Sequence, residues 1–446
     1  MAASTNPAVP TAPGRLPGLG HMLQLATRPI EFMGSLRSVG DLAWIYLGRQ
    51  PVLSVNTPEL IHRMVVTEGR KYDQGKYFDK IRDTFGNGLP VSNGEFHHRQ
   101  RRLIQPAFHH QRITGYLDTM AESATAMAES WRPGEVVQLR RDALSLMLVL
   151  VARTLFSAGA SEAVQAEVQR SWKTIVTGLA RRTVQPDFLE KLPTPGNRRF
   201  ESATARLREV VRDAVVAQRS GATGDGSNLL DMLIEARDED TGEGMTDEQV
   251  MAEVFLILFA GTETAGFMTV WFFYELSRDP ELERRVHDEI DGVLSGRPAG
   301  IADLPKLELT RRVLTECLRR YHPGWSFMRR ANSTVELGGL EFPEGTETVF
   351  SINSLHRDPR IFPDPMKFDP DRWLPGGPEI PEGGFIPFLE GKRQCIGDSF
   401  AWAQMTCTVA AIASRWRLRP VDGHRMKEQP GVLMSPNETP MTVLER

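Results

Sequence analysis

Three features of the sequence predict a mainly α-helical fold with small peripheral β-sheets. Residues from about 95 to 292 follow a helical pattern with few interruptions. They include one apolar stretch of roughly 30 residues that has start and stop signals at its two ends. Short segments of strand pattern occur at about 40–56 and 334–352. Most of the core is therefore expected in helices, with the strands at the periphery.

Length and composition exclude several classes of protein. The chain has 446 residues, 41% of them hydrophobic, which is enough for a large core, and length alone would predict two or three domains. The net charge of -4 provides no basic bias for phosphate contacts, so no nucleic-acid partner is expected. Cys317, Cys395 and Cys407 are too few for a disulfide framework. They predict a reducing compartment, hence a cytoplasmic protein.

Neither the N-terminus nor the interior of the chain predicts a membrane anchor. The proline-rich segment 1–20 contains no continuous apolar run, so it does not have the pattern of a signal peptide. Residues 254–274 are long and apolar enough to span a bilayer. However, Glu263 lies at the centre of this stretch, where a charge is costly in lipid. We therefore expect a helix buried in the core.

The first expected elements are a hairpin and a short helix. Residues 42–47 and 52–55 have the pattern of paired strands, and Thr57 followed by Pro58 marks a helix start. Residues 70–94, which are rich in aromatic side chains, are expected to form a long irregular loop. Long loops of this kind are often functional.

The central helix has recognisable signals at both ends. Thr246 is followed three residues later by Gln249, which is the spacing of a capping box, and Asp279-Pro280 ends the pattern. At 1.5 Å per residue this helix would be about 45 Å long. The later elements are a helix over 305–321, strands 334–337 and 340–342 joined by Gly338-Gly339, proline-rich coil over 359–387, a helix over 398–414, and short strands and turns over 415–446.

The segment 388–397, Phe-Leu-Glu-Gly-Lys-Arg-Gln-Cys-Ile-Gly, is a candidate metal or nucleophile site. Cys395 stands where a helix is expected to begin, and a Lys-Arg pair precedes it, so the helix dipole and the cations both favour a thiolate. Gly391 and Gly397 allow tight turns and the close approach of a flat group. A thiolate is a soft ligand for iron or copper, or a nucleophile. A buried structural thiol is the third interpretation.

The middle of the central helix carries polar residues where the pattern is otherwise apolar. The sequence Ala260-Gly261-Thr262-Glu263-Thr264 places a carboxylate and hydroxyls inside a buried helix, where they need partners such as water. Gly261 lowers helix stability by roughly 1 kcal/mol relative to Ala, which indicates a need for close approach. One interpretation is a satisfied structural kink. The other is a proton relay, which the candidate metal-binding cysteine favours.

Glu316 and Arg319 are three residues apart on an expected helix, so they share a face and can form an ion pair. Such pairs are common on protein surfaces and have little specificity. Their neighbours Leu314 and Leu318 are apolar, which indicates burial. A buried pair needs a further partner, and Arg372 in the segment 368–373 is a candidate.

His97 and Arg101 are four residues apart on an expected helix over 95–102. They can present two cationic donors to one anionic ligand, such as a carboxylate. The alternative is a basic surface face, because Arg99 and Arg102 lie on the same helix.

Together these segments resemble the cytochrome P450 family, the haem-thiolate monooxygenases. Residues 388–397 are similar to its haem-ligand signature, and 260–264 to the oxygen-activation groove of its central helix. Residues 316–319 resemble its Glu-x-x-Arg pair, and 368–373 its arginine-containing meander. The four occur in the family's order, and the resemblance covers essentially the whole chain. It implies a single domain over 1–446, with the haem between the long central helix and the cysteine loop.

The resemblance also implies a role for each matching residue. Cys395 would be the axial thiolate ligand of haem b, and Phe388 would pack on the sulfur side. Glu263 and Thr264 would hold water and deliver protons to bound dioxygen. The remaining haem-binding positions are His97, Arg101, Arg329 and Arg393 at the propionates, with Ala260, Gly261, Gly391 and Gly397 among the other residues of the site.

Three residues would hold the haem-binding loop, and two positions depart from the family pattern. Glu316, Arg319 and Arg372 would form the structural network. Leu389 stands where the family prefers a small or polar residue, so the turn before the ligand is expected to be altered. His97 replaces a common tryptophan, although histidine also occurs there in bacterial members.

For the activity, the resemblance implies insertion of one oxygen atom from O2 into an apolar small molecule. The thiolate donates electron density to iron and favours O–O cleavage, while a buried acid, a hydroxyl and water relay the protons. We expect no flavin or iron–sulfur region in the chain. Electrons would therefore come from ferredoxin and an NAD(P)H-linked ferredoxin reductase.

The expected substrate pocket lies between the 70–94 loop, the central helix and the residues that follow Pro323. Its candidate members are Phe78, Phe85, Phe255, Phe259, Trp325, Phe327 and Met328, for several of which core packing is the simpler interpretation. Their apolar character predicts an uncharged hydrophobic substrate. Segments 192–200 and 325–329 resemble bacterial terpene-oxidising members, which favours a terpenoid such as a sesquiterpene. A fatty acid, a macrolide and a steroid are alternatives.

Two other functional classes are open at this point. One is a haem-thiolate peroxygenase or an oxygen-independent isomerase, and the intact Glu263-Thr264 pair argues against it. The other is a non-catalytic haem-binding sensor or carrier, against which the same pair and the apolar pocket argue. The sequence does not determine the substrate, the oxidised position, the number of successive oxidations, the redox partners or the oligomeric state.

Overall fold

The chain folds into two units, each built from segments that are far apart in the sequence. The computed structural model describes residues 6–156, 158–184, 187–220 and 228–446, so the first five residues of the proline-rich segment lie outside it. Unit 1 comprises Met1–Asp79 and Thr315–Cys395, and unit 2 comprises Lys80–Leu314 and Ile396–Arg446. The chain therefore passes from one unit to the other directly after Cys395.

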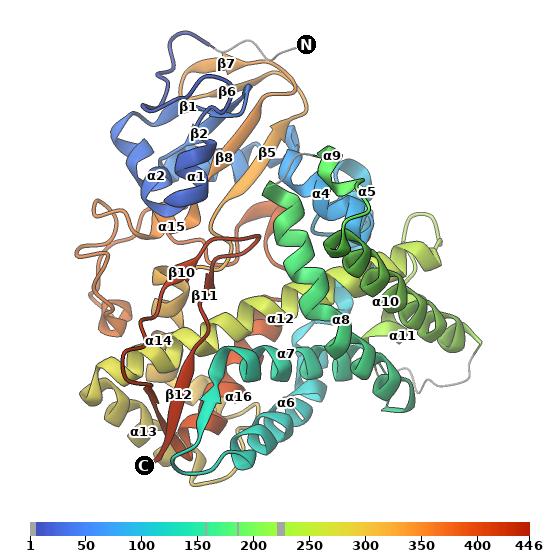
Figure 1. Ribbon diagram of the computed structural model, residues 1–446, viewed down its shortest axis with the longest axis vertical. Helices are drawn as coiled ribbons and strands as arrows, with labels where there is room; N and C mark the ends of the chain where they lie inside the picture. Colours follow the sequence, from blue (N-terminus) through green and yellow to red (C-terminus); the bar gives the residue numbers. More distant parts are fainter. Residues whose placement is uncertain (1–5, 157, 185–186, 221–227) are drawn as a thin grey trace. The chain divides into compact units, whose positions relative to one another are not determined.

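Unit 1 is organised around a five-stranded sheet (Figure 1). Its strand order is β1 (Leu42–Leu47), β2 (Gln50–Val55), β8 (Glu347–Phe350), β5 (Phe327–Ala331) and β3 (Tyr72–Gln74). The predicted hairpin is confirmed as β1 and β2, which pair antiparallel with Trp44 opposite Leu53. The second predicted hairpin is confirmed as β6 (Val335–Leu337) and β7 (Leu340–Phe342), and both turn glycines have positive φ.

The helices of unit 1 are short, and one of them corrects the sequence prediction. They are α1 (Met22–Thr27), α2 (Pro29–Ser35), α3 (Pro58–His62) and α15 (Ile352–His356), while α4 (Lys76–Phe85) and α14 (Glu308–Arg320) cross the boundary between the units. The prediction that residues 70–94 are irregular throughout is wrong, because they contain β3 and α4. The helical spacing was present in the sequence: Ile81, Thr84 and Phe85 are buried on one face of α4.

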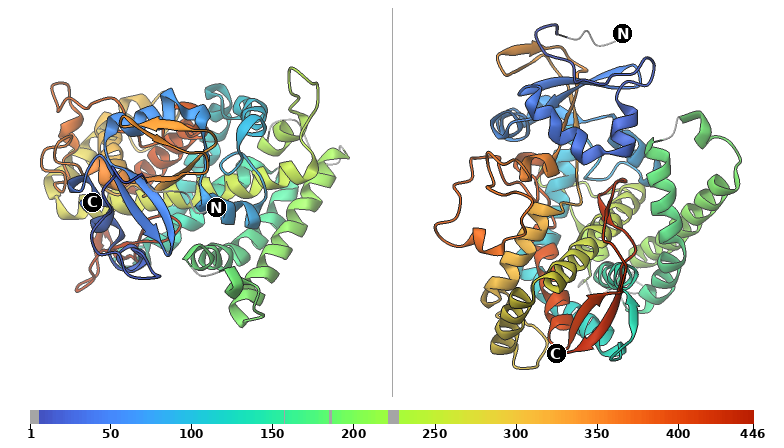
Figure 2. Two further views of the ribbon diagram at one scale, coloured as in Figure 1. Left: turned by 90° about the horizontal axis from the view of Figure 1, so that it is seen from above. Right: turned by 60° about the vertical axis from the view of Figure 1, so that its left-hand side comes forward.

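Unit 2 is mainly helical, and α12 (Asp247–Arg278) runs through its middle with α7, α10 and α16 packed against it (Figures 1 and 2). Its peripheral sheets have the orders β4-β12-β9 and β10-β11. The other elements of unit 2 are α5 (Gly94–Ile104), α6 (His110–Ser130), β4 (Val136–Gln138), α7 (Leu139–Leu155), α8 (Ala158–Val184), α9 (Asp187–Glu190), α10 (Pro195–Arg219), α11 (Leu229–Glu235), α13 (Pro280–Leu294), α16 (Asp398–Ala413), β9 (Trp416–Pro420), β10 (Glu428–Gln429), β11 (Ser435–Pro436) and β12 (Pro440–Glu445).

Helix α12 begins and ends where the sequence predicts. The side chain of Thr246 accepts a hydrogen bond from the backbone N–H of Gln249, and the Gln249 side chain accepts one from the N–H of Thr246, which completes the capping box. The helix is long and apolar enough to cross a membrane, but 78% of its apolar window is buried within the protein. This is the pattern of a core helix.

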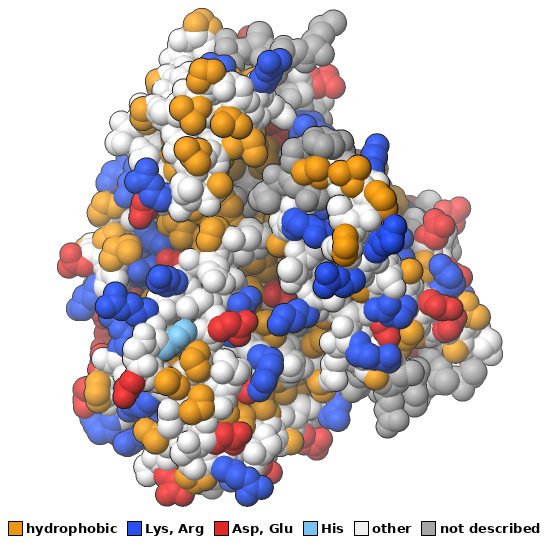
Figure 3. All heavy atoms as spheres, in the orientation of Figure 1, with side chains coloured by type: hydrophobic (Ala, Val, Ile, Leu, Met, Phe, Trp, Pro, Cys, Tyr) orange, Lys and Arg blue, Asp and Glu red, His pale blue; other side chains and the backbone are white. Residues whose placement is uncertain are grey.

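Charged side chains of both signs are interspersed on the face of the protein shown in Figure 3. This distribution agrees with the small net charge of -4. Exposed large apolar side chains occur together in the N-terminal part of unit 1, namely Leu16, Leu19, Met22 and Leu23.

Candidate functional site

Helix α12 is buried along most of its length but has an open stripe near its centre. Ala260 is exposed, and Ile257, Gly261 and Thr264 are half-buried, whereas most of their helical neighbours are buried. Residues at these spacings, three and four apart, lie on one face of a helix. The polar segment predicted from the sequence therefore carries an accessible stripe at the centre of a core helix.

Glu263 lies beside this stripe and is buried in unit 2. The indole N–H of Trp172, from α8, donates a hydrogen bond to Oε1 of Glu263 over 3.1 Å. Burial raises the pKa of Glu263 from 4.5 to about 6, while the Trp172 hydrogen bond and the positive charge of Arg140 act in the opposite direction. The carboxyl group can therefore exchange a proton near neutral pH. Trp172 was missed in the sequence, where it looks like any apolar position of a helix.

Thr264 places its hydroxyl on the open stripe. Its Oγ1 donates a hydrogen bond of 2.7 Å to the carbonyl oxygen of Ala260, one turn earlier. The hydroxyl oxygen retains its acceptor capacity while it donates this bond. Glu263 and Thr264 thus bring an acid and a hydroxyl to the centre of α12, as the sequence predicts, and their role in proton delivery stays a prediction.

The need for a glycine at 261 has a structural cause within unit 2. A Cβ atom added to Gly261 would lie 2.9 Å from Cγ2 of Val151 in α7, and one added to Gly266 would lie 2.8 Å from Cδ2 of Leu144. Both glycines therefore allow α7 to pack closely on α12. The predicted close approach is confirmed, but its partner is a helix, and a haem contact at Gly261 stays a prediction.

The cysteine loop in unit 1 is closed by backbone hydrogen bonds. The N–H of Cys395 donates to the carbonyl oxygen of Phe388 over 2.8 Å, and the N–H of Gln394 donates to Gly391 over 3.1 Å. Cys395 is exposed, and α16 begins three residues later, with Gly397 as its N-cap. The loop therefore presents its thiol at the surface of unit 1, at the predicted loop-to-helix junction.

Two residues of this loop have left-handed backbone conformations. Gly391 has φ of 66°, and an added Cβ would lie 2.5 Å from the carbonyl oxygen of Val65, so only glycine fits. Leu389 has φ of 56°, which is unusual for a residue with a side chain. That this turn is altered relative to the family pattern stays a prediction. At Gly397 an added Cβ would make only ordinary contacts with Phe108.

Arg329 is a buried cation in unit 1 with an unsatisfied donor. Its Nη1 donates to Oε1 of Gln74 over 2.6 Å and to the carbonyl of Met328 over 2.9 Å, but its buried Nη2 has no hydrogen-bond partner among the described residues. Burial and the positive charge of Arg393 lower the pKa of Arg329 to about 9. A buried guanidinium near a second cation, with a donor to spare, fits an anionic group of a ligand.

Arg330, the neighbour of Arg329, has acidic partners. Arg330 is paired with Glu347 over 2.6 Å and with Asp79 over 3.0 Å. Both acids balance its charge within unit 1, and Arg330 points its guanidinium toward them. Arg329 is therefore the better-suited member of the pair for a bound carboxylate.

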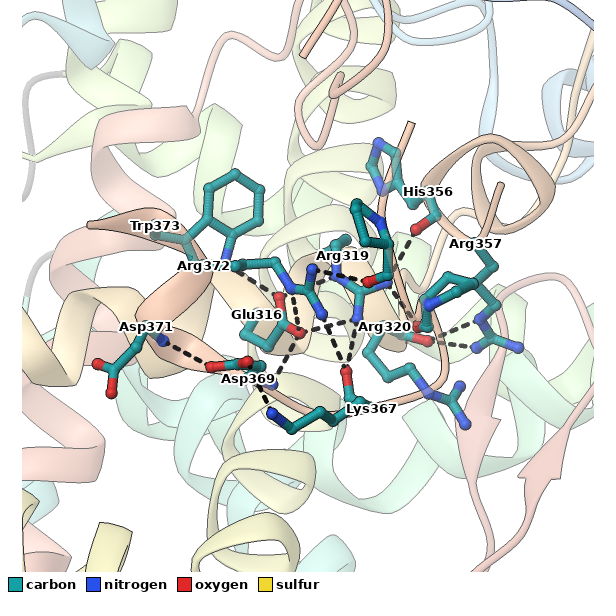
Figure 4. Close-up of polar contacts among 12 residues, drawn as sticks. Glu316, Arg319, Arg320, His356, Arg357, Lys367, Asp369, Asp371, Arg372 and Trp373 are labelled. Atoms are coloured by element: carbon teal, nitrogen blue, oxygen red, sulfur yellow. Dashed lines mark hydrogen bonds and ion pairs between the residues drawn. The ribbon is translucent and has the colours of Figure 1, made fainter. Parts of the chain in front are cut away.

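Glu316 is the centre of the predicted structural network, and all of its members lie in unit 1 (Figure 4). Its carboxylate accepts two bonds of 2.8 Å from Arg319, one of 3.1 Å from Nε of Arg372 and one of 3.0 Å from the indole of Trp373. The backbone N–H of Asp369 adds a fifth bond of 3.0 Å. Arg319 also donates to the carbonyl oxygens of His356, Pro365 and Lys367. The network thus ties α14 to the meander.

Two histidines that the sequence did not single out support the segment before Phe388. His322 has its Nε2 2.8 Å from the carbonyl oxygen of Pro387, and Nε2 of His356 accepts a hydrogen bond of 3.0 Å from the N–H of Ile386. Burial is the first cause that lowers the pKa of both rings. They therefore stay neutral at physiological pH and act as fixed hydrogen-bonding groups.

The predicted helix with two cationic donors is α5, in which His97 is buried and Arg101 is half-buried. Their basic neighbours have other partners. Arg102 pairs with Asp238 over 2.8 Å, and Arg99 donates to the carbonyl of Gly244 over 3.1 Å. These two arginines therefore hold the 238–244 segment, while binding of a carboxylate by His97 and Arg101 stays a prediction.

The candidate pocket residues form aromatic clusters within each unit. In unit 2, Phe85 lies 6.1 Å from Phe255 and 5.9 Å from Phe259 between ring centroids, and Trp172 lies 6.4 Å from Phe259. In unit 1, Phe327 lies 6.5 Å from Phe78. Trp325 and Met328 pack in an apolar cluster of unit 1. These contacts suit packed cores as well as pocket walls, so substrate contact stays a prediction.

Comparison with known proteins gives the family. The family profile described as Cytochrome P450 matches residues 10–443. The chain is 43% identical over 415 residues to cyclooctat-9-en-7-ol 5-monooxygenase of Streptomyces melanosporofaciens, covering 93% of this chain and 90% of the relative. It is 39% identical over 410 residues to pentalenene oxygenase of Streptomyces avermitilis, covering 92% and 91%. The chain belongs to the cytochrome P450 family.

A solved structure confirms the predicted fold. The crystal structure of the cytochrome P450DA heme domain matches with a TM-score of 0.86 and covers 98% of both chains at 24% identity. The resemblance inferred from four short motifs is therefore confirmed by a match along nearly the whole chain. Proteins of this family bind haem through a cysteine thiolate and use O2.

Proposed function

We propose that this cytochrome P450 is a monooxygenase that inserts one oxygen atom of O2 into an apolar terpenoid. Two electrons and two protons are consumed in each turnover, and the second oxygen atom leaves as water. The observation that carries the proposal is the centre of α12, where the Thr264 hydroxyl lies on an open stripe and the buried acid Glu263 lies beside it. Acids with strongly perturbed pKa values cluster at catalytic sites, which favours an enzyme over a binding protein.

The residues present fit a haem. We propose that Cys395, which is exposed on unit 1, would supply the thiolate ligand, and that the unpartnered Nη2 of Arg329, with Arg393 nearby, would bind a propionate. His97 and Arg101 are the proposed further propionate ligands. A bound haem with a thiolate ligand supplies the reductive cleavage of dioxygen. The Glu316–Arg319–Arg372 network holds the meander before the loop, and Phe388 accepts the hydrogen bond that closes it.

The chain's own contribution to the reaction is the control of protons. Glu263 has a pKa of about 6, so it can give up a proton and recover it from solvent near neutral pH. The hydroxyl of Thr264 can hold a water molecule in place through its remaining acceptor capacity. Ala260 and Gly261 leave room on the same stripe, because neither has a side chain beyond Cβ.

The terpenoid assignment rests on relatives and on the apolar clusters. The relatives that match most of the chain include a cyclooctat-9-en-7-ol 5-monooxygenase, a cyclooctatin synthase and a pentalenene oxygenase. The candidate walls in both units are aromatic, which suits an uncharged substrate. Within this class, a sesquiterpene-like hydrocarbon skeleton is the specific proposal.

The proposal includes separate redox partners and a cytoplasmic location. Ferredoxin and an NAD(P)H-linked ferredoxin reductase are the proposed electron donors, on the similarity to bacterial members of the family. An odd number of cysteines agrees with a reducing compartment. Since one family profile spans both units, we also propose that 1–446 act as one domain.

Turnover with defined electron sources tests the proposal. The purified holoprotein is incubated with terpene hydrocarbons and either ferredoxin, reductase and NAD(P)H or hydrogen peroxide alone, and products are identified by mass spectrometry with 18O2. We expect an 18O-labelled alcohol to form only when the redox partners are present. A product formed with peroxide alone would indicate a peroxygenase. A rearranged product that carries no label would indicate an isomerase, and substrate binding without any product would indicate a carrier. Absence of the red-shifted thiolate Soret band in the reduced carbon-monoxide complex would contradict the assignment of Cys395.

A further inference from the structure

A second buried acid on α12 has no role in the proton relay. Glu253 is only 1% exposed, and its two carboxyl oxygens lie 2.8 and 2.9 Å from the backbone N–H of Leu89, from which they accept a shared hydrogen bond. No ion pair joins Glu253 to another described residue. Burying a carboxyl group that has only one amide donor costs free energy.

The segment that Glu253 contacts is a loop of residues 86–92, here called the anchored loop. It follows α4 and lies directly on the first half of α12. A Cβ added to Gly88 would lie 2.6 Å from Cδ1 of Leu256, and one added to Gly86 would lie 2.8 Å from the Cβ of Ala252. The two glycines therefore bring the loop backbone against the turn of α12 that carries Glu253.

Other contacts hold the C-terminal end of the anchored loop and the last turn of α4 before it. Nε of Arg82 donates to the carbonyl oxygen of Val91 over 3.2 Å, and Arg208 of α10 donates to the carbonyl of Thr84 over 2.6 Å. The contact between Glu253 and Leu89 fixes the middle. Leu89 and Val91 are buried at 6% and 1% exposure, so the loop presents packed apolar side chains rather than a mobile tip.

Glu253 lies on the same face of α12 as the open stripe. It precedes Ile257 by four residues, Ala260 by seven and Thr264 by eleven, which are spacings of one helix face. Ala260 is about 10 Å farther along the axis. The anchored loop thus covers the N-terminal end of the face whose centre is open. The point where the loop contacts α12 is therefore about 10 Å along the helix axis from the centre of the open stripe.

We propose that Glu253 is a positioning residue for the monooxygenase: by holding Leu89 it fixes the anchored loop as the end wall of the substrate groove and so restricts which substrate carbon reaches the open stripe. This inference rests on the proposed function. It adds a specificity residue that lies outside the relay and outside every haem-binding segment.

The protonation state of Glu253 gives this role a distinctive signature. Burial raises the pKa of Glu253 from 4.5 to about 8, and the Leu89 amide acts in the opposite direction. The cations that contact the adjoining backbone, Arg82 and Arg208, donate to the carbonyl oxygens of Val91 and Thr84. The closed loop therefore holds a neutral acid at pH 7. If the acid ionises in water when the loop opens, opening becomes easier as pH rises from 4.5 to 8 and constant above it.

Hydrogen exchange of the holoprotein tests the anchoring independently of turnover. We compare wild type with Glu253→Gln, which keeps an acceptor for Leu89 but cannot ionise, and with Glu253→Leu, which keeps the volume and loses the acceptor. Exchange of peptides covering 86–92 is corrected for intrinsic rates at several values between pH 5 and pH 9. We expect the ratio of the exchange rate in wild type to that in Glu253→Gln to rise up to pH 8 and then level off. In Glu253→Leu, exchange at fixed pH should be about fivefold faster, the factor for loss of one hydrogen bond.

Product analysis then tests the effect on specificity. Glu253→Gln should keep the wild-type ratio of oxidised regioisomers, and Glu253→Leu should give several-fold more of the minor isomers at similar haem content. A pH-independent exchange ratio, or an unchanged isomer ratio in a folded Glu253→Leu protein, would overturn the proposal. If Glu253→Leu does not fold, the pH series with Glu253→Gln decides alone. If no substrate is turned over at all, the proposed function fails while the exchange result still stands.

Discussion

The indole N–H of Trp172 donates a hydrogen bond to Oε1 of Glu263 over 3.1 Å, and this contact joins α8 to the centre of α12. Trp172 also packs on Phe259, which in turn contacts Phe85. The acid of the proposed relay is therefore linked to the aromatic cluster proposed to line the substrate pocket. A substrate that moves these rings would also change the surroundings of the carboxyl group.

The raised pKa of Glu263 predicts a specific dependence of stability on pH. The folded protein holds the proton up to about pH 6, whereas the unfolded chain releases it near 4.5. The stabilisation is therefore complete below pH 4.5 and is lost as pH rises through 6, by about 2 kcal/mol in total. Urea unfolding of wild type and Glu263→Gln is measured between pH 4.5 and 7.5. The loss appears as a change with pH in the difference between the free energies of unfolding of the two proteins.

Trp172→Phe is the matched variant for this measurement. It keeps an aromatic ring on Phe259 but removes the N–H that lowers the pKa of Glu263. We expect the pKa to rise, so that the loss of stability extends to higher pH than in wild type. In the double variant with Glu263→Gln, Trp172→Phe should leave the pH profile unchanged. An identical profile in wild type and Trp172→Phe would show that the indole does not act on the acid.

Thr264→Ala should uncouple electron use from product formation. The variant removes the hydroxyl from the open stripe and leaves the backbone of α12 intact, because alanine is a good helix former. Product formed per NAD(P)H consumed should fall by roughly one order of magnitude or more, with hydrogen peroxide released instead, since positioned proton transfer contributes roughly 10²–10⁴-fold.

Thr269→Ala provides the control for Thr264. Thr269 makes the same kind of hydrogen bond, from Oγ1 to the carbonyl of Ala265 over 3.1 Å, but it is fully buried and lies off the stripe. Its variant should keep the wild-type ratio of product to peroxide even if stability falls. Equal uncoupling in both variants would show that the effect arises from helix packing and not from the hydroxyl on the stripe.

The sequence predicted those parts of the site that depend on local chemistry at fixed spacing. The capping box of α12, the Glu316–Arg319 pair and the glycine before the cysteine are such cases, and each has the predicted form. Their physical causes act within a few residues, so a single sequence contains them.

The missed residues act across long separations. Trp172 and Glu263 are 91 positions apart, and Glu253 contacts an amide 164 positions away. The role of the Trp172 indole depends on a buried acid on another helix. No residue near Trp172 in the sequence indicates that acid. Helix α4 is a different case: its amphipathic spacing was present but lay within a stretch whose aromatic residues suggested a loop.

Loss of the Glu316 carboxylate should be among the most destabilising single changes in unit 1. Glu316→Gln leaves the buried cations Arg319 and Arg372 without their counter-charge, and removing one partner of a buried pair costs about 3–5 kcal/mol. Trp373→Phe removes one hydrogen bond and should cost about 1 kcal/mol. Urea unfolding of both variants measures the two free energies of unfolding.

An exposed pair of the same spacing is the control for Glu316. Glu281 and Arg284 are three residues apart on α13 and 2.6 Å apart between charged atoms, but both are solvent-exposed. Glu281→Gln should therefore change stability little, because water already solvates both groups. A similar loss in Glu281→Gln and Glu316→Gln would mean that burial does not determine the strength of the network.

The left-handed conformation of Leu389 should make this position sensitive to side-chain shape rather than to volume. Its φ of 56° costs a residue with a Cβ roughly 1–2 kcal/mol, and branching at Cβ makes the conformation still less favourable. Leu389→Ile keeps the apolar volume against the core of unit 1 and should lower the free energy of unfolding by about 1 kcal/mol or more. Leu389→Met, which is unbranched at Cβ, should be nearly neutral. In Leu389→Ile the amide of Cys395, which donates to Phe388, should also exchange faster. Equal stability of the two variants would mean that packing, and not backbone conformation, determines the residue at 389.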